Sequence, residues 1–167
     1  MQLNFIIRKN KQLKNSPLSV LSGYYMSPSG LLKVVEDDAG MHSIDFVEDI
    51  LDQKSGMPQS LNIAGTPFQI AVWQEVIKVP AGAVVTYEQL AHAIGKPKAV
   101  RAVANALAQN TIAYFIPCHR VIRKDGSLGG YKWGIESKTA LLKAEKYVPT
   151  RDSARMGARP PFWTTGA

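Results

Sequence analysis

The stretch TYEQLAHAIGKPKAVRAVANALAQN, residues 86–110, contains two helix patterns joined by a glycine and a proline. The first pattern begins with a capping box, Thr86-x-x-Gln89, and ends at Gly95. The second has Pro97 near its first turn and ends at the asparagine that closes the stretch. Two short helices so closely spaced have the dimensions of a helix-turn-helix, and this pair organises the rest of the chain.

The second helix of the pair is almost free of large side chains on one side. Arg101 stands there among alanines, namely Ala99, Ala102, Ala104, Ala106 and Ala108. Small side chains allow a helix to approach another surface closely, and that surface is either a nucleic-acid groove or a tightly packed neighbouring helix. The pattern leaves both interpretations open.

Upstream of the pair, residues 66–69 (TPFQ) form another capping box with proline at the first helical position, which predicts a further helix. Before it, short apolar runs alternate with turn residues over 20–46, which predicts a three-stranded antiparallel meander. Residues 62–65 are typical of a linker. We therefore expect a small N-terminal domain over 1–63 and a mainly helical domain over 64–146.

Downstream, residues 111–116 are apolar, β-branched and aromatic, which predicts a buried strand leading into Pro-Cys-His-Arg at 117–120. A glycine-rich loop follows over 125–134. A last helix is expected over 136–146. Residues 147–167 contain three prolines and no periodicity, which predicts a flexible tail.

Composition narrows the class of protein. The chain has 167 residues, 46% of them hydrophobic, which is enough to bury a core. It has no long apolar run and no secretory pattern at its start, so we expect a soluble cytoplasmic protein that enters no membrane. Of the net charge of +7, most falls in residues 64–146, with eleven Lys and Arg against five Asp and Glu. Either a polyanion-binding surface or a solubilising one would account for this excess.

The chain has one cysteine, Cys118. A single thiol forms no internal disulfide and no thiolate-rich zinc site, so we expect neither a metal nor a cofactor. Cys118 is either a small core residue or a reactive thiol. Its neighbours His119 and Arg120 are groups that lower a thiol pKa or accept its proton, and the glycine-rich loop is long enough to wall a pocket.

Together, the sequence PCHRV at 117–121, the helix pair upstream and the Gly-Ser-Leu-x-Gly-Tyr loop downstream resemble the O6-alkylguanine-DNA alkyltransferases, also called methylated-DNA–protein-cysteine methyltransferases. The resemblance covers 65–145 and looks most like the C-terminal half of Ada-type repair regulators. It implies an α+β fold, in which a truncated, ribonuclease H-like antiparallel domain precedes a helical domain with a winged-helix-like helix-turn-helix. It also implies DNA repair by single, irreversible transfer of the alkyl group of O6-alkylguanine to Cys118, with O4-alkylthymine as a further candidate.

The resemblance implies roles for the catalytic residues. Cys118 is the nucleophile, while His119 and Glu145 form a relay that accepts the thiol proton through a water. Tyr87 assists rotation of the 3′ phosphate and acts on the base. Asn110 is a hinge between the recognition helix and the active-site strand. The expected pocket residues are Tyr131, Trp133, Val121 and Ser127.

The implied partner is double-stranded DNA, bound by a monomer through the minor groove. Arg101 matches the finger that fills the space left by the flipped base. The other expected DNA contacts are Ala99, Ala102, Lys96, Lys98 and Arg120. Within a bacterium the protein would be associated with the nucleoid.

Two other function classes stay open beside the transferase. Three of the assigned residues also have a purely structural interpretation when each is taken alone. Tyr87 would be an ordinary first-turn residue, Glu145 a partner for a nearby lysine, and Asn110 a helix cap. A non-catalytic alkyltransferase-like module that binds DNA lesions commonly has tryptophan in place of the cysteine, whereas Cys118 is present here. A helix-turn-helix transcription factor needs several Arg, Asn or Gln side chains facing bases, whereas this helix offers mainly methyl groups.

Overall fold

The computed structural model describes residues 2–7, 21–27, 30–37, 40–47 and 60–147. The fold is α+β, as expected. The helices are α1 (Pro67–Ile77), α2 (Tyr87–Ala93), α3 (Val100–Ala108) and α4 (Ile135–Ala144), with a 3-10 turn at Cys118–Arg120. The strands are β1 (Gln2–Ile7), β2 (Leu21–Ser27), β3 (Gly30–Asp37), β4 (Gly40–Val47), β5 (Ser60–Gly65), β6 (Val85–Thr86) and β7 (Val121–Ile122).

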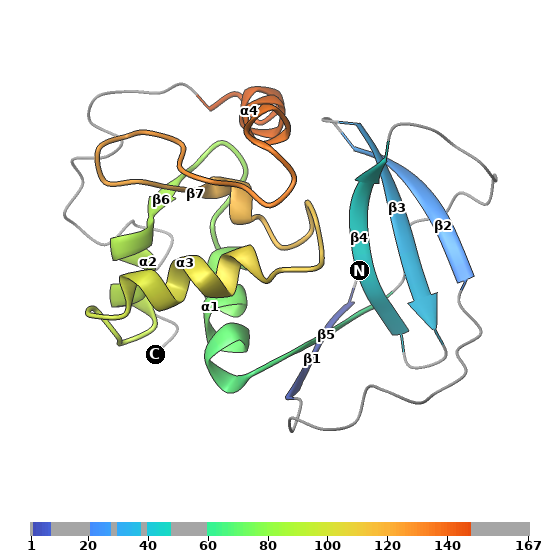
Figure 1. The fold of residues 1–167 in the computed structure, drawn as a ribbon, viewed down its shortest axis with the longest axis horizontal. Helices are drawn as coiled ribbons and strands as arrows, with labels where there is room; N and C mark the ends of the chain where they lie inside the picture. The colour runs from blue at the N-terminus through green and yellow to red at the C-terminus, as the bar shows by residue number, and fades with distance from the viewer. Residues whose placement is uncertain (1, 8–20, 28–29, 38–39, 48–59, 148–167) are drawn as a thin grey trace.

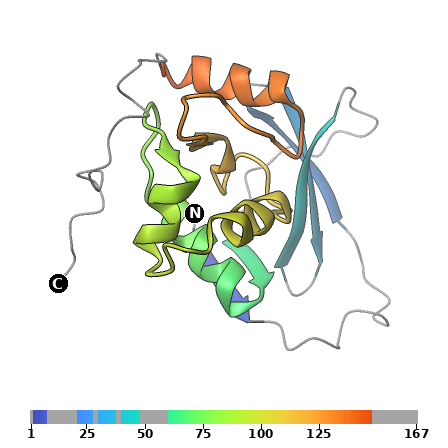
Figure 2. The same cartoon turned by 60° about the vertical axis from the view of Figure 1, so that its left-hand side comes forward.

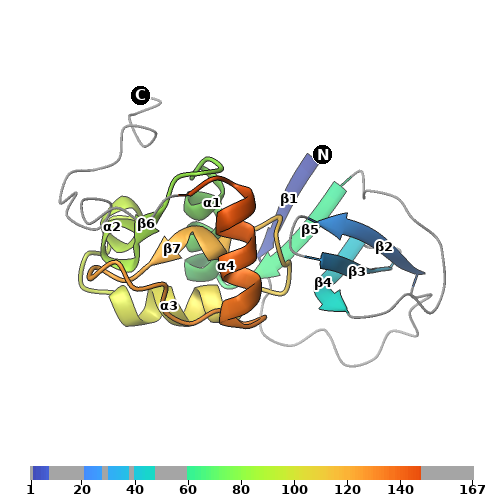
Figure 3. The ribbon, with the colours of Figure 1, turned by 90° about the horizontal axis from the view of Figure 1, so that it is seen from above.

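The N-terminal part contains two sheets. Strands β2, β3 and β4 pair in that order and antiparallel, which confirms the predicted meander. The predicted linker over 62–65 is wrong, because these residues belong to β5, which pairs in parallel with β1. The partner strand lies more than fifty residues upstream, so no local pattern announces the pairing. Strand β5 contacts both β4 and α1, and it lies between the meander and the helices (Figures 1 and 3).

Helix α1 begins as its capping box predicts. The Thr66 hydroxyl accepts from the backbone N–H of Gln69 at 3.2 Å, and the Gln69 side chain accepts from the N–H of Thr66 at 2.8 Å. Trp73 is buried and donates from Nε1 to the carbonyl of Ala106 at 3.0 Å, which ties α1 to α3. A Cβ at Gly65 would lie 2.6 Å from the Trp73 ring, so the junction of β5 and α1 requires glycine.

Helices α2 and α3 form the predicted pair. The second capping box is present, with Thr86 accepting from the N–H of Gln89 at 3.1 Å. Gly95 follows α2 with φ of +71°, a conformation that favours glycine. Helix α3 begins at Val100, later than predicted, because residues 96–99 form a turn closed by the Ala99 N–H on the Lys96 carbonyl at 2.9 Å.

The two interpretations of the alanine-rich helix apply to different faces of α3. Val103, Ala106 and Leu107 are buried in the core, so one face packs against neighbouring helices. Ala102 and Ala108 are exposed, so small side chains also line the solvent face. The buried face therefore agrees with the helix-packing interpretation, and the approach of the exposed face to a nucleic-acid groove stays a prediction.

The predicted strand over 111–116 is wrong, although Ile112, Ala113 and Ile116 are buried as expected. The segment curls into turns around Asn110, whose Oδ1 accepts from the N–H of Ile112 at 2.8 Å. Its Nδ2 lies 3.2 and 3.3 Å from the carbonyls of Ile112 and Ile116. One amide side chain thus takes the backbone bonds that a neighbouring strand would supply. Tyr114 adopts φ of +66° within the turn.

The last described segments enclose the Cys118 turn. Strands β6 and β7 pair in parallel, with Val85 opposite Val121, and α4 contacts the turn. In Figures 1 and 2 the loop after β7 runs between α3 and α4. No helix among the described residues is long and apolar enough to cross a membrane. The predicted tail, apart from Tyr147, lies outside the described residues, and the predicted boundary at 63/64 stays a prediction.

Candidate active site

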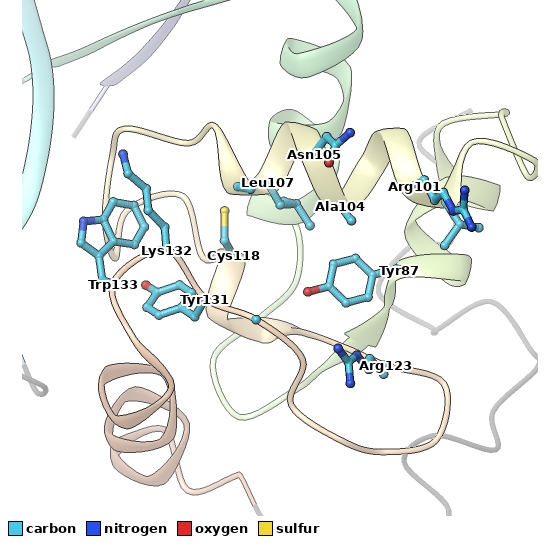
Figure 4. A pocket seen from close by; sticks show the side chains of 13 residues that line it. Tyr87, Arg101, Ala104, Asn105, Leu107, Cys118, Arg123, Tyr131, Lys132 and Trp133 are labelled. Atoms are coloured by element: carbon cyan, nitrogen blue, oxygen red, sulfur yellow. The ribbon is translucent and has the colours of Figure 1, made fainter.

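A pocket of about 550 Å³ lies between α3 and the loop after β7, with Cys118 at its wall (Figure 4). Helix α3 supplies one side of the pocket, and the glycine-rich loop supplies the other. The lining residues are Tyr87, Val100, Arg101, Ala104, Asn105, Leu107, Ala108, Cys118, Arg123, Gly130, Tyr131, Lys132 and Trp133. The structure therefore brings the cysteine, the tyrosine of α2 and the arginine of α3 to one cavity, although 31 residues separate Tyr87 from Cys118 in the chain.

The thiol of Cys118 is buried and faces Asn110. Only 6% of the residue is exposed, and Nδ2 of Asn110 lies 3.1 Å from Sγ. Burial raises the pKa of Cys118 to about 12, although the hydrogen bond from Asn110 opposes this shift. The nearby cations Lys138 and Lys132 also lower the thiol pKa, but burial outweighs them. At neutral pH the group is therefore a thiol that needs a base, which leaves proton acceptance as the role expected of its neighbours.

His119 follows the cysteine and is fully buried. Burial lowers its pKa, although the hydrogen bond to Glu145 opposes that shift. His119 is therefore a neutral imidazole at pH 7. Its Nε2 lies 2.9 Å from Oε1 of Glu145, and because an ionised carboxylate only accepts, this nitrogen carries the proton. The other nitrogen, Nδ1, is buried without a protein hydrogen-bond partner, which leaves it able to accept a proton.

Glu145 follows the end of α4, and its carboxylate accepts hydrogen bonds from His119 and Arg120. Arg120 donates from Nε to Oε2 at 3.0 Å and from Nη2 to Oε1 at 2.6 Å. Burial raises the pKa of Glu145, but the bonds from His119 and Arg120 outweigh it and lower the pKa to about 2. The carboxylate is therefore ionised throughout the physiological range and fixes the orientation of the imidazole.

Arg120 was expected to contact DNA, but its guanidinium binds groups of the protein itself. Its guanidinium binds Glu145 on one side, and its Nη1 donates to the carbonyl of Val79 at 2.6 Å on the other. Only 15% of its side chain is exposed. A bidentate arginine–carboxylate pair with both partners largely buried is a positioning contact, so we correct the DNA assignment of Arg120.

The remaining expected DNA contacts lie together at the start of α3. Arg101 and Ala102 are exposed on the first turn, and Lys96 and Lys98 are exposed in the preceding turn. Ala99 is half-buried at the N-terminal cap of the helix. The three cations are therefore exposed within six positions of the chain, and one of them, Arg101, lines the pocket.

Two expected pocket residues do not line the cavity. Val121 is fully buried in β7, where it faces the core. Ser127 is exposed in a turn, where its hydroxyl and its N–H both bind Oδ1 of Asp125. Tyr131 and Trp133 do line the pocket, with ring centroids 5.3 Å apart.

The sequence analysis missed a buried lysine beneath the site. Lys138 on α4 is fully buried and donates from Nζ to the carbonyl of Val121 at 2.7 Å and to that of Leu128. Burial lowers its pKa to about 8. A signal was present, because Lys138, Leu141 and Leu142 share one helical face and all three are buried. Lys138 thereby fastens the pocket loop to the strand that follows the cysteine.

The comparisons with known proteins agree on one family. The profile described as 6-O-methylguanine DNA methyltransferase, DNA binding domain, matches residues 67–147. The methylated-DNA–protein-cysteine methyltransferase of Kluyveromyces lactis is 39% identical over 151 residues, covering 86% of this chain and 76% of the relative. The bifunctional transcriptional activator/DNA repair enzyme Ada of Escherichia coli is 49% identical over 104 residues, covering 62% of this chain. This chain spans 29% of that relative and 24% of the Salmonella typhimurium regulatory protein ada.

Solved structures give the same result. The OGT of Mycobacterium tuberculosis in complex with DNA superposes with a TM-score of 0.62 at 28% identity, covering 80% of this chain and 98% of that one. The O6-methylguanine methyltransferase of the same organism also gives a TM-score of 0.62, at 30% identity, with 77% and 93% covered.

Proposed function

The chain belongs to the 6-O-methylguanine DNA methyltransferase family, and we propose that it repairs DNA by transferring the alkyl group of O6-alkylguanine to its own Cys118. One observation carries this proposal: a buried thiol lines a pocket large enough for a base, and the residue that follows it is a neutral histidine bound to an ionised glutamate. Such an arrangement can activate a thiol without leaving a thiolate exposed to solvent.

The chemistry follows from the protonation states. Sγ of Cys118 attacks the alkyl carbon, so a sulfur–carbon bond forms while the carbon–O6 bond breaks. The electron pair of the broken bond stays with guanine, which takes up a proton. The thiol proton passes through a water to Nδ1 of His119, and Glu145 stabilises the resulting imidazolium. The thioether has no good leaving group, so each molecule reacts once.

We assign the proton delivered to the departing base to the hydroxyl of Tyr87, which lines the pocket. Burial raises the pKa of Tyr87, so the hydroxyl keeps its proton at neutral pH and is available as a donor. Asn110 supports the site from the other side, because its side chain joins the end of α3 to Sγ of Cys118. We keep for it the role of a hinge between the DNA-binding helix and the active-site turn.

The target base lies inside the duplex, so the nucleotide must be rotated out of the stack to reach Cys118. Helix α3 would lie in the minor groove, where its exposed alanines permit close approach. Arg101 is the side chain we assign to the vacated space, because it is exposed on α3 and also lines the pocket. Lys96 and Lys98 would contact phosphates on either side.

The finer features of the fold and setting belong to the same proposal. Strands β1 to β5 would form a reduced ribonuclease H-like domain, and α2, α3 and the β6–β7 pair a winged-helix-like unit. The parallel pairing of β6 with β7 beside the helix pair supports the second assignment. We propose a cytoplasmic monomer.

The decisive experiment uses a duplex that carries O6-methylguanine with a labelled methyl group. One label per protein molecule is expected on the peptide containing Cys118. Cys118→Ala should transfer no label while its affinity for the duplex stays close to that of the wild type, because the cations that bind DNA are unchanged. Substantial transfer by the alanine variant, or repeated turnover by the wild type, would contradict the proposal.

A further inference from the structure

Arg123 directly follows β7 and lines the pocket on the wall that faces α3 (Figure 4). The residue is exposed, and its guanidinium has no hydrogen-bond or ion-pair partner within the described part of the chain. Its neighbour Lys124 is also exposed but is paired with Glu88 at 2.9 Å. The two adjacent cations therefore differ, because only Arg123 adjoins the pocket and only Lys124 is held in an ion pair.

Arg123 and Tyr87 approach the same point of the backbone. A Cβ at Gly129 would lie 3.3 Å from Oη of Tyr87 and 3.4 Å from Cγ of Arg123. Gly129 adopts φ of +69° there, and the absence of a side chain leaves room for both groups. The guanidinium side chain thus lies beside the phenol at the edge of the pocket. In Figure 4 Tyr87 lies between Arg101 on α3 and Arg123 on the opposite wall.

The chemistry of a nucleotide explains what such a pair would bind. A base that enters the pocket stays covalently joined to its sugar, so its phosphodiester groups must lie at the mouth. A guanidinium pairs with phosphate oxygens in a bidentate manner, whereas the hydroxyl of Tyr87 is assigned to the departing base. Arg101 is needed on the helix side, in the stack. The loop wall has two cations, Arg123 and Lys132. Nζ of Lys132 donates to the carbonyl of Asn110 at 3.1 Å and lies 5.0 Å from the centroid of the Trp133 ring. Arg123 is therefore the cation of that wall that is available to a phosphate.

We propose that Arg123, which lies beside Tyr87 at the edge of the pocket, binds a phosphodiester of the DNA strand that carries the modified nucleotide. This inference rests on the proposed function and adds a residue to it. Arg123 holds the rotated nucleotide by its backbone and makes no contact with the reacting base. It is therefore required for reaction with a duplex and dispensable for reaction with a free base.

The binding experiment uses proteins with Cys118→Ser, so that affinity is measured without reaction. Arg123→Ala, Arg123→Lys and the matched control Lys124→Ala are titrated by fluorescence anisotropy against a duplex containing O6-methylguanine at several salt concentrations. Arg123→Ala should weaken binding roughly tenfold, as expected for loss of one charge-assisted contact. Its plot of log affinity against log salt should become shallower by about 0.9, the value for one phosphate. Lys124→Ala and Arg123→Lys should keep the slope of the parent protein.

The transfer experiment uses the same substitutions with Cys118 intact. Arg123→Ala should slow transfer from the duplex and leave transfer from free O6-methylguanine base unchanged. Equal losses in Arg123→Ala and Lys124→Ala, or an equal slowing of duplex and free base, would overturn the assignment. Failure of the wild type to transfer a methyl group would contradict the proposed function, whereas the salt slopes test Arg123 independently of any transfer.

Discussion

At the scale of single residues, the side chains of Cys118 and His119 are both uncharged before the reaction. Burial raises the pKa of the thiol to about 12 and lowers that of the imidazole, so neither group is charged at pH 7. A thiolate–imidazolium pair, as found where a cysteine is exposed to cations, is absent from this resting state. The proton moves only when an alkyl carbon is in place, which protects the thiol from other electrophiles.

This protonation state predicts the pH dependence of the transfer rate. The base must be neutral His119, and its pKa lies below the ordinary value of 6.5. The rate constant should therefore be flat from pH 8 down to about 6.5 and decrease only at lower pH, where the imidazole becomes protonated. Single-turnover rates on the duplex, measured from pH 5 to pH 8, check this. A rate that rises steadily across this range would indicate that thiolate formation limits the reaction.

The contrast between Glu145 and Arg101 separates chemistry from base rotation. Glu145→Gln should slow transfer from the duplex and from the free base by about tenfold or more. General base catalysis typically accelerates a reaction by about 10²–10⁴-fold, and the variant loses part of this acceleration. Arg101→Ala should slow transfer from the duplex only, because a free base needs no rotation out of a stack. Single-turnover rates on both substrates measure this.

Glu136→Gln is the matched control. Glu136 is an exposed glutamate in the first turn of α4, and Glu145 caps the other end of this helix. The rates of this control should equal those of the wild type. If Arg101→Ala slowed both substrates by the same factor while still folded, the role assigned to Arg101 would be wrong.

At the scale of elements, α4 does more than cover the core. Lys138 binds the carbonyls of Val121 and Leu128, and these belong to β7 and to the pocket loop. Lys138→Met keeps the length of the side chain but leaves both carbonyls without this donor. We expect a loss of about 1–3 kcal/mol in the free energy of unfolding, the cost of unsatisfied buried acceptors.

Urea denaturation measures that loss, and hydrogen exchange should show faster exchange of the loop amides over 123–134. The control is Lys143→Met, because Lys143 is exposed on the same helix. Unchanged stability and exchange in Lys138→Met would mean that the loop is held by its aromatic contacts alone.

The junction between β5 and α1 depends on close packing. A methyl group at Gly65 would lie 2.6 Å from the ring of the buried Trp73, so the ring or the strand must shift. Gly65→Ala should destabilise the protein by about 1–3 kcal/mol, as over-packed cores do. Thermal denaturation checks this against Gly130→Ala, where no atom lies within 4 Å of the new methyl group and no change is expected.

At the scale of the whole molecule, the charge is divided between two parts. Residues 64–146 hold eleven Lys and Arg against five Asp and Glu, whereas residues 1–63 hold six against seven. The cations at 96, 98 and 101 are exposed at the start of α3, and Arg101 also lines the pocket, so DNA should meet this part of the surface first. The N-terminal strands lie to one side of the helices (Figure 1), and every residue that lines the pocket belongs to the second part.

This distribution predicts how binding to undamaged DNA responds to salt and sequence. The logarithm of the affinity should fall linearly with log salt, by about 0.9 for each phosphate neutralised. Duplexes of unrelated sequence should bind within a few-fold of one another, because a minor-groove helix lined with alanine reads little of the base code. Anisotropy titrations with several duplexes check both points. Strong discrimination among them would favour a sequence-reading regulator.

The sequence by itself determined the elements whose signals are local. Both Thr-x-x-Gln boxes start helices, since cap and partner lie three residues apart, and the meander follows from its turns. The motif around Cys118 identified the family, because several residues at family spacing rarely coincide by chance. The apolar composition of residues 111–116 also placed Ile112 and Ile116 in the core.

Only the tertiary structure decided the rest, because the deciding contacts join residues far apart in the chain. Parallel pairing of β1 with β5 converted an expected linker into a strand. The side chain of Asn110 turned an expected strand into a compact turn under Sγ of Cys118. Arg120, which was expected to contact DNA, binds Glu145 instead. Burial raises the pKa of Cys118. Burial and long-range pairing depend on the packed fold, so no local pattern carries them.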